Sequence, residues 1–168
     1  MERERCELQA ELWFDDALTT ARTIGYPVLE RHGLKAHISV ITSRVGKESP
    51  IEGINYPVLT VEDLKFLIGK GWEIASHSVT HPMRFDLLTP EETAYELEES
   101  KRWIRENLNV TPTKFVIPNH AIRNDQLGLV RKHYLYIRPP GNPIEGHLIF
   151  HWIVSEEWLE NLLARNQL

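Results

Sequence analysis

The stretch Gly71-Trp-Glu-Ile-Ala-Ser-His-Ser-Val-Thr-His81 contains the change of secondary structure that decides the fold. A helix is predicted to begin at Thr60, whose side chain can cap the first turn beside Asp63, and to end at Gly71. The short run Trp72–Ser76 then predicts a strand, and two histidines follow it directly. A helix that leads into a short strand with polar side chains at its end is the unit that parallel α/β folds repeat.

The same alternation of short strands and longer helices runs along most of the chain. Strands are predicted at Leu8–Phe14, Lys35–Ile41, Trp72–Ser76, Lys114–Ile117, Leu135–Arg138 and Leu148–His151. Helices are predicted at Pro27–His32, from Thr60 to Gly71, from Thr89 to Asn109, at Asp125–His133 and from Ser155 onward. The Pro- and Gly-containing segments Ser49–Pro57 and Pro139–Pro143 are interpreted as loops. Six strands with helices between them indicate an α/β fold whose sheet forms an open or incomplete barrel.

Length and composition fit one compact domain over residues 1–168. Hydrophobic residues make up 42% and charged residues 26%, as in an ordinary globular protein, and no run of residues suggests a membrane span. The formal net charge is −5, and the basic residues are scattered among acidic ones, so nucleic acid is not expected as a partner. The single cysteine, Cys6, excludes an intrachain disulfide and a zinc site built from thiolates.

The beginning of the chain bears on the expected location. Met1–Arg5 contains no apolar stretch of the kind that a secretory signal requires. The chain is therefore expected to be cytoplasmic, unless it is a domain trimmed from a longer protein. Association of the chain with a second copy of itself stays open.

Polar side chains capable of chemistry lie at or just after the ends of four predicted strands. They are Asp15, Asp16, His77, His81, Asn119, His120 and His151. Because the carboxyl ends of parallel strands share one face of the fold, residues that are distant in sequence can converge there. We therefore expect one active site at this face.

Two imidazoles and one carboxylate, from His77, His81 and Asp16, suit zinc or another late first-row divalent ion, and leave a position for water. Taken alone, the histidine pair fits two unrelated surface residues, and Asp15 with Asp16 fits a helix N-cap beside a solvated carboxylate. Their joint occurrence at strand ends favours a metal site. Pro82 disfavours helical geometry at His81, so the segment between the histidines is expected to be a loop.

These motifs resemble those of a known family. Phe14-Asp-Asp-Ala17 resembles a Thr-Phe-Asp-Asp-Gly motif, and His77-Ser-Val-Thr-His81 matches a His-Ser/Thr-x-x-His motif without a mismatch. Phe115-Val-Ile-Pro118 is similar to a Phe-Ala-Tyr-Pro motif, and Leu148-Ile-Phe-His151 to a strand that carries a catalytic histidine. From about residue 12 to residue 163 the chain resembles the polysaccharide deacetylases of the NodB-homology group, carbohydrate esterase family four.

The resemblance implies a deformed, incomplete (β/α) barrel that binds one divalent metal ion. Zn²⁺ is the expected ion, and Co²⁺ and Ni²⁺ are alternatives. Asp16, His77 and His81 would hold the ion. Asp15 would act as general base and His151 as general acid. The backbone N–H of Asn119, after Pro118, would help to stabilise the oxyanion. The implied reaction removes acetyl groups from N-acetylated carbohydrate, or from O-acetylated carbohydrate.

Three departures from the family pattern leave alternatives open. Ala17 replaces a glycine, and Asn119 replaces an aromatic residue. Val116 stands where the family has an arginine that orients the base, so Lys114, Arg123 or Arg138 would have to reach Asp15 instead. A related amidase that acts on a small non-sugar amide is one alternative. A glycan-binding module that keeps the metal without turnover is the other.

Overall fold

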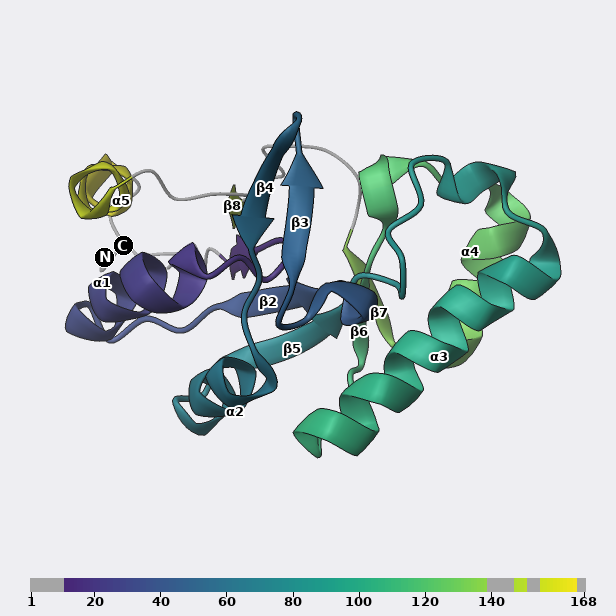
Figure 1. The fold of residues 1–168 in the computed structure, drawn as a ribbon, viewed down its shortest axis with the longest axis horizontal. Helices are drawn as coiled ribbons and strands as arrows, with labels where there is room; N and C mark the ends of the chain where they lie inside the picture. The colour runs from purple at the N-terminus through teal and green to yellow at the C-terminus, as the bar shows by residue number, and fades with distance from the viewer. Residues whose placement is uncertain (1–10, 139–146, 151–154, 166–168) are drawn as a thin grey trace, which may run out of the picture.

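A computed structural model describes residues 11–138, 147–150 and 155–165 of the chain (Figure 1). Its main feature is a parallel sheet of six strands in the order β7-β6-β5-β2-β1-β8. The strands are β1 (Glu11–Phe14), β2 (His37–Val40), β5 (Glu73–Ser76), β6 (Lys114–Val116), β7 (Tyr136–Arg138) and β8 (His147–Phe150). Each of the six predicted strands is thus present, whereas residues 8–10 of the first predicted strand and His151 of the last lie outside the described residues.

The sheet is curled and open, because β7 and β8 lie at its opposite edges. The first strand, β1, lies between β2 and β8, with Trp13 opposite His37 on one side and opposite Ile149 on the other. The structure therefore confirms the predicted fold class, an α/β fold with an incomplete barrel.

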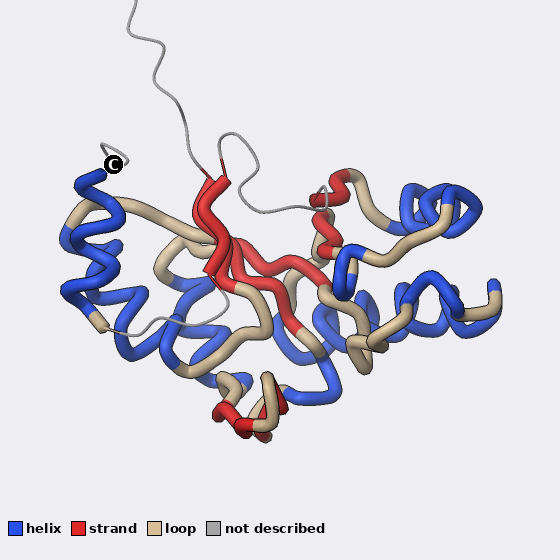
Figure 2. The backbone as a smooth tube through the Cα atoms, turned by 90° about the horizontal axis from the view of Figure 1, so that it is seen from above, coloured by secondary structure: helices blue, strands red, loops and turns tan. Residues whose placement is uncertain are grey.

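The helices lie along the flanks of the sheet (Figure 2). They are α1 (Tyr26–Arg31), α2 (Val61–Gly69), α3 (Pro90–Leu108), α4 (Asn124–His133) and α5 (Glu156–Arg165), with short turns η1 (Ala21–Gly25), η2 (Thr42–Arg44), η3 (Phe85–Leu87) and η4 (Pro118–His120). The longest helix, α3, begins as its sequence predicts. Thr89 accepts a hydrogen bond from the backbone of Glu92, and the Glu92 carboxylate accepts one from the backbone of Thr89.

The two faces of the sheet have different roles. Successive side chains of a strand point to opposite faces, so Leu12 and Phe14 of β1 face one side, and Trp13 the other. Leu12 and Phe14 belong to the main hydrophobic core. Trp13 packs in a separate cluster with Ala75 and Val116. Asp15 is two residues after Trp13, so the same alternation places its carboxylate on the inner side of the curled sheet.

The expectation of a loop at Ser49–Pro57 was wrong. This segment contains an antiparallel hairpin of β3 (Glu48–Ile51) and β4 (Ile54–Pro57), which stands above the main sheet in Figure 1. Glu52 and Gly53 connect the strands, and both have positive φ, 51° and 80°. Two such residues form the turn that matches the twist of a tight hairpin. The prolines that suggested a loop are tolerated because both strands are edge strands.

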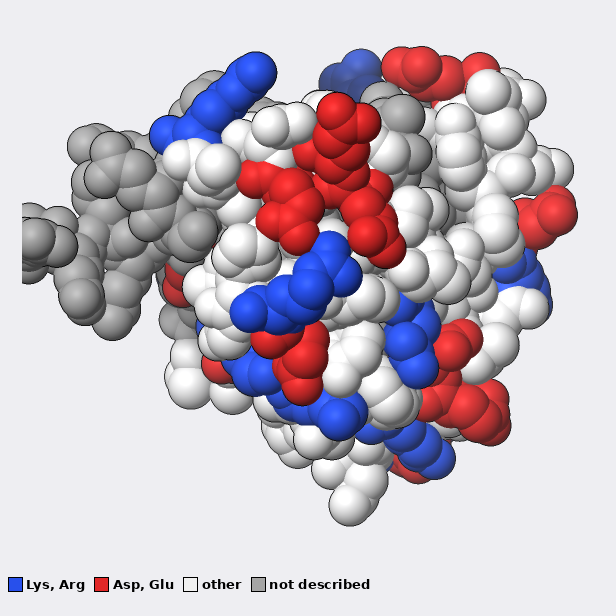
Figure 3. All heavy atoms as spheres, turned by 90° about the vertical axis from the view of Figure 1, so that its left-hand side faces the viewer, with Lys and Arg blue, Asp and Glu red and all other residues white. Residues whose placement is uncertain are grey.

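Charged side chains of both signs lie next to one another on the face drawn in Figure 3, which is the left-hand side of Figure 1, where α1 and α5 are located. Arg31 of α1 pairs with Glu160 of α5 at 2.8 Å, and His32 lies 2.7 Å from the same carboxylate. These exposed pairs lie between α1 and α5, and screening by solvent makes each a weak contribution to stability. Among the helices in the described part of the chain, none has the length and apolar character needed to cross a membrane.

Candidate active site

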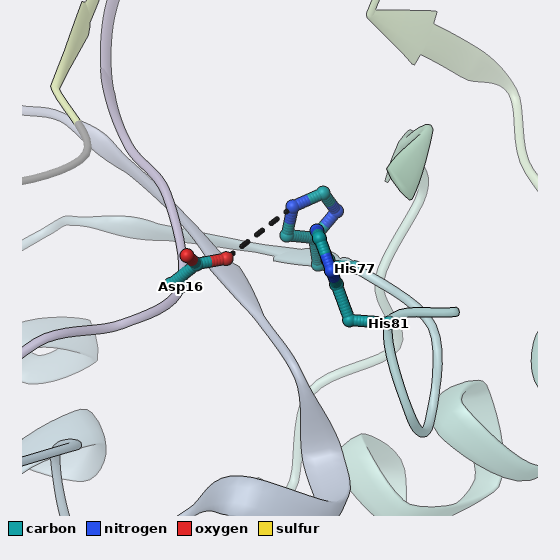
Figure 4. A group of neighbouring side chains, drawn as sticks. All are labelled: Asp16, His77 and His81. Atoms are coloured by element: carbon teal, nitrogen blue, oxygen red, sulfur yellow. Dashed lines mark ion pairs between the residues drawn. The ribbon is translucent and has the colours of Figure 1, made fainter. Parts of the chain in front are cut away.

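The three predicted metal ligands lie together at the carboxyl ends of β1 and β5 (Figure 4). Asp16 comes from the loop after β1, and His77 and His81 come from the loop after β5. One ligand atom from each residue lies within 4.8 Å of the other two. Nε2 of His77 is 3.5 Å from Oδ1 of Asp16, and the two imidazole rings are 4.5 Å apart. The donors thus converge on a volume small enough for one ion.

The orientation of His77 is set by the backbone of the neighbouring strand. Its Nδ1 lies 2.9 Å from the carbonyl oxygen of Val116, and the ring is 3% exposed. A carbonyl oxygen only accepts hydrogen bonds, so Nδ1 carries the proton and donates it. The lone pair is then on Nε2, the atom that faces Asp16. This is the tautomer that a metal ligand needs.

The second histidine, His81, is held in its neutral form. Burial, and after it repulsion between the two imidazoles when both are protonated, lowers the pKa of His81 to about 4. A ring with this pKa is unprotonated at neutral pH. Its nitrogen is therefore available to a cation without displacement of a proton.

The backbone around the site adopts conformations that side chains normally avoid. Positive φ angles occur in all three loops that surround the pocket, at Asp16, Ala17, Ser78, His81, Asn119 and His120. Such strain is typical of functional sites. Ala17 has φ of 53°, which explains why the related motif has glycine at this place. His81, at φ of 57°, lies in a loop as predicted.

The residue that supports the histidine loop was not predicted from the sequence. Glu96 of α3 is buried, and its carboxylate accepts hydrogen bonds from the backbone N–H of Val79 at 2.7 Å and of Thr80 at 2.9 Å. It also accepts one from the Thr80 hydroxyl at 2.6 Å. A signal was present, because Glu96 falls on the same helical face as the apolar Leu97 and Ile104, where a charge needs a partner.

The predicted general base, Asp15, is held by a buried arginine. Arg138 of β7 donates from Nη1 to Oδ1 at 2.7 Å and from Nη2 to Oδ2 at 2.6 Å. Ser39 of β2 donates to Oδ1 at 2.7 Å. Both charged side chains are 1% exposed. This fork-to-fork geometry fixes the carboxylate in position.

Of the three cationic side chains named as replacements for the missing arginine, Arg138 is the one that reaches Asp15. Lys114 instead pairs with Glu73 at 2.8 Å, and Arg123 pairs with Asp125 at 3.0 Å. The sheet register explains the substitution. Arg138 on β7 lies directly beside Val116 on β6, so the guanidinium comes from the neighbouring strand at the same level of the sheet.

These residues surround a cavity of about 640 Å³. It is lined by Asp15, Asp16, Arg44, Pro50, Ile51, Glu52, His77, His81, Met83, Ile117, Asn119, His120 and Arg138. Of the two predicted oxyanion residues, Asn119 lines the cavity, whereas Pro118 is buried and is not part of the lining. His151 lies outside the described residues. The strand that precedes it, β8, places Phe150 opposite Phe14 of β1.

Fold and site together define a class, α/β proteins with an open parallel sheet and a candidate metal site at the carboxyl ends of its strands. Residues 3–137 match the family model described as polysaccharide deacetylase. The chain therefore belongs to the polysaccharide deacetylase family. It is also similar to the putative polysaccharide deacetylase YxkH of Bacillus subtilis, with 32% identity over 99 residues. That alignment covers 59% of this chain and 31% of the relative, so the chain matches about a third of the relative's length.

Solved structures support the fold. The Streptococcus pyogenes deacetylase PplD, in complex with acetate, superposes with a TM-score of 0.70 at 22% identity, over 90% of this chain and 68% of PplD. The de-N-acetylase from Aggregatibacter actinomycetemcomitans gives 0.67 at 17% identity, over 91% and 74%. A mutant of a CE4 family pseudoenzyme with restored enzymatic activity gives 0.75 at 18% identity, over 96% and 63%. Since the fold occurs in a pseudoenzyme, the fold alone does not establish turnover.

Proposed function

We propose that the chain is a metal-dependent deacetylase that hydrolyses the acetamide bond of N-acetylated carbohydrate, with O-acetylated carbohydrate as a second substrate class. One observation carries this proposal. A cluster of one carboxylate and two imidazoles lies beside a second carboxylate, Asp15, which a buried arginine holds in place. Family membership gives the reaction class that such a pair of groups would serve.

The donor set of Asp16, His77 and His81 fits a divalent ion. Two neutral nitrogens and one carboxylate oxygen match the preference of Zn²⁺, and Co²⁺ and Ni²⁺ also accept them. His77 already presents Nε2, and the carbonyl of Val116 plays the supporting role expected of a group behind a metal-bound histidine. When bound, such an ion supplies Lewis acidity toward a carbonyl oxygen and makes water more acidic.

The protein's own side chains would accept and donate the protons that the reaction transfers. Asp15, oriented by Arg138 and Ser39, accepts the proton of the attacking water. His151 donates a proton to the leaving amine. The backbone N–H of Asn119, which has φ of 48° next to the cavity, donates to the oxyanion.

The two alternatives, an amidase and a binding module without turnover, depend on different residues of the site. Asn119 in place of an aromatic residue is compatible with a small non-sugar amide as substrate, because a sugar-stacking surface is then dispensable. A binding module without turnover was suggested by the missing arginine. Since Arg138 makes the corresponding contact to Asp15, that reason no longer applies.

A combined metal and activity measurement tests the proposal. Purified protein should contain about one divalent ion per chain and release acetate from acetylated oligosaccharides. Asp15→Asn should retain the metal and lose acetate release by at least about 100-fold, whereas His77→Ala should lose both. Asp125→Asn, an exposed carboxylate on α4, is the matched control and should behave as wild type. Turnover restricted to small amides would replace the proposal by the amidase, and metal without any turnover would replace it by the binding module.

A further inference from the structure

Arg44 occupies a place in the cavity that the proposed reaction does not use. It ends the turn η2, directly after β2, on the same side of the sheet as the metal ligands. The turn is tied to the histidine loop by two backbone hydrogen bonds, from Thr42 to Ser78 at 3.3 Å and from Ser43 to Val79 at 3.1 Å. The position of Arg44 relative to the site is therefore set by the backbone.

The guanidinium itself is also held in place. Nη1 donates to Oγ of Ser49 at 2.8 Å, and Nη2 donates to the carbonyl oxygen of Thr80 at 3.3 Å. Ser49 belongs to β3 and is fully buried. The hairpin thus holds the arginine at the cavity wall, which reduces the entropy that a ligand would otherwise have to remove.

The charge of Arg44 has no internal counter-ion among the described residues. Arg138 is neutralised by Asp15, whereas no described carboxylate lies within the 4.0 Å of an ion pair from Arg44. Its contacts, Ser49 and Thr80, are neutral acceptors. A guanidinium has five N–H donors, and two are used here, which leaves three for a ligand.

Resting on the function proposed above, we propose that Arg44 forms a subsite for an anionic group, a carboxylate or a phosphate, carried by the acetylated substrate. The planar fork of a guanidinium binds both groups in a bidentate manner. The apolar side chains of Pro50 and Ile51 line the same cavity, so part of a ligand bound at Arg44 would contact apolar surface. Glu52 also lines the cavity, but it is exposed at the hairpin turn, where solvent screens its charge.

Binding of oligosaccharides that cannot be hydrolysed tests the subsite independently of turnover. The probes are tetrasaccharides with hydroxyl groups in place of acetamido groups. One carries a carboxylate, one a phosphate monoester, and one the carboxamide that matches the carboxylate in size. Calorimetry with the metal-loaded protein should show that at least one anionic probe binds roughly tenfold or more tightly than the carboxamide, as expected for hydrogen bonds between charged groups. The anionic probe with the lower Kd shows whether the group bound in the natural substrate is a carboxylate or a phosphate.

Variants assign this preference to Arg44. Arg44→Gln should reduce the ratio of the two Kd values to about one, and Arg44→Lys should give an intermediate ratio because it keeps the charge without the fork. Lys47→Gln removes the same charge from an exposed position that does not line the cavity, and should keep the wild-type ratio. Equal Kd values for all three probes with the wild type would overturn the subsite. A retained preference in a protein without acetate release would leave the subsite standing and refute the deacetylase.

Discussion

Asp15 and Arg138 are charged groups that lie almost completely out of contact with water. Removing two ions from water is costly, and the cost is offset only where geometry and hydrogen bonding are good. Here both carboxylate oxygens and both terminal guanidinium nitrogens are engaged, and Ser39 adds a third donor. An arrangement of this kind is better explained by a requirement for a fixed carboxylate than by stability alone.

A double-mutant cycle measures this pair. Arg138→Gln should lower the free energy of unfolding by about 3–5 kcal/mol, because it leaves a buried carboxylate without a countercharge. Combining it with Asp15→Asn should restore part of the loss, since two neutral amides remain. Urea unfolding of the metal-free proteins gives the four values. Strictly additive losses would show that the two groups are not coupled.

The neutral state of His81 makes stability depend on pH. Its pKa is about 4 in the folded protein against 6.5 for an ordinary histidine. The unfolded chain therefore takes up the proton first as the pH falls. Stability is fully present above about pH 6.5 and decreases toward pH 4, by up to about 3 kcal/mol.

Unfolding of the metal-free protein between pH 8 and pH 4 checks this dependence. His81→Gln cannot take up the proton, so its free energy of unfolding should decrease less over the interval from pH 6.5 to pH 4. Parallel curves for wild type and variant would contradict the assignment of the pH dependence to His81.

Among the elements, α3 supports the site most directly. Its buried Glu96 accepts three hydrogen bonds from Val79 and Thr80, which lie between His77 and His81. Ser100, one turn further along the helix, is within 2.8 Å of the hydroxyl of Ser76 at the end of β5. The helix thus positions both ends of the segment that would bind the metal.

Glu96→Gln tests this support. An amide has one acceptor oxygen and two donor hydrogens, so it cannot reproduce the three contacts to the loop. Zinc affinity, measured by competition with a chromophoric chelator, should fall roughly 10- to 100-fold, as for other groups that orient metal ligands. Glu99→Gln, at a position on the same helix where the carboxylate pairs with Arg102 on the surface, should keep wild-type affinity. Equal affinity in Glu96→Gln and wild type would refute the role of α3.

At the scale of the whole molecule, the site joins strands that are far apart in sequence. Asp15 and Asp16 follow β1, His77 and His81 follow β5, and Arg138 ends β7. The parallel arrangement brings these ends to one rim of the curled sheet. A bound ion would therefore connect distant parts of the chain and stabilise the folded state as a whole.

Thermal unfolding measures how much a bound ion stabilises the folded state. With free Zn²⁺ at about 100 times its Kd, the folded state should gain about 2.7 kcal/mol. For a chain of this size this corresponds to a rise in Tm of about 5–10 °C. Scanning calorimetry of chelator-treated and zinc-loaded protein gives the difference. His77→Ala should show little or no rise, and a rise equal to that of wild type would place the ion elsewhere.

Local features of the sequence predicted most of the secondary structure. The strands of the main sheet and the capped helices follow from patterns within a few residues, such as Thr89 with Glu92. The hairpin was missed because Pro50 and Pro57 disfavour strands in general, and only its position away from the main sheet makes them acceptable. The convergence of the candidate ligands was predicted because two local motifs occur at strand ends, and a parallel fold brings strand ends together.

The sequence by itself determined the parallel α/β architecture, the family, and the candidate ligands Asp16, His77 and His81, because strand and helix periodicity and short motifs are encoded by neighbouring residues. Only the tertiary structure decided which cation holds Asp15, what supports the histidine loop, and where Arg44 is aimed. Those contacts depend on strand register and helix packing. Such pairings join residues up to 123 positions apart, and no spacing in the sequence specifies them.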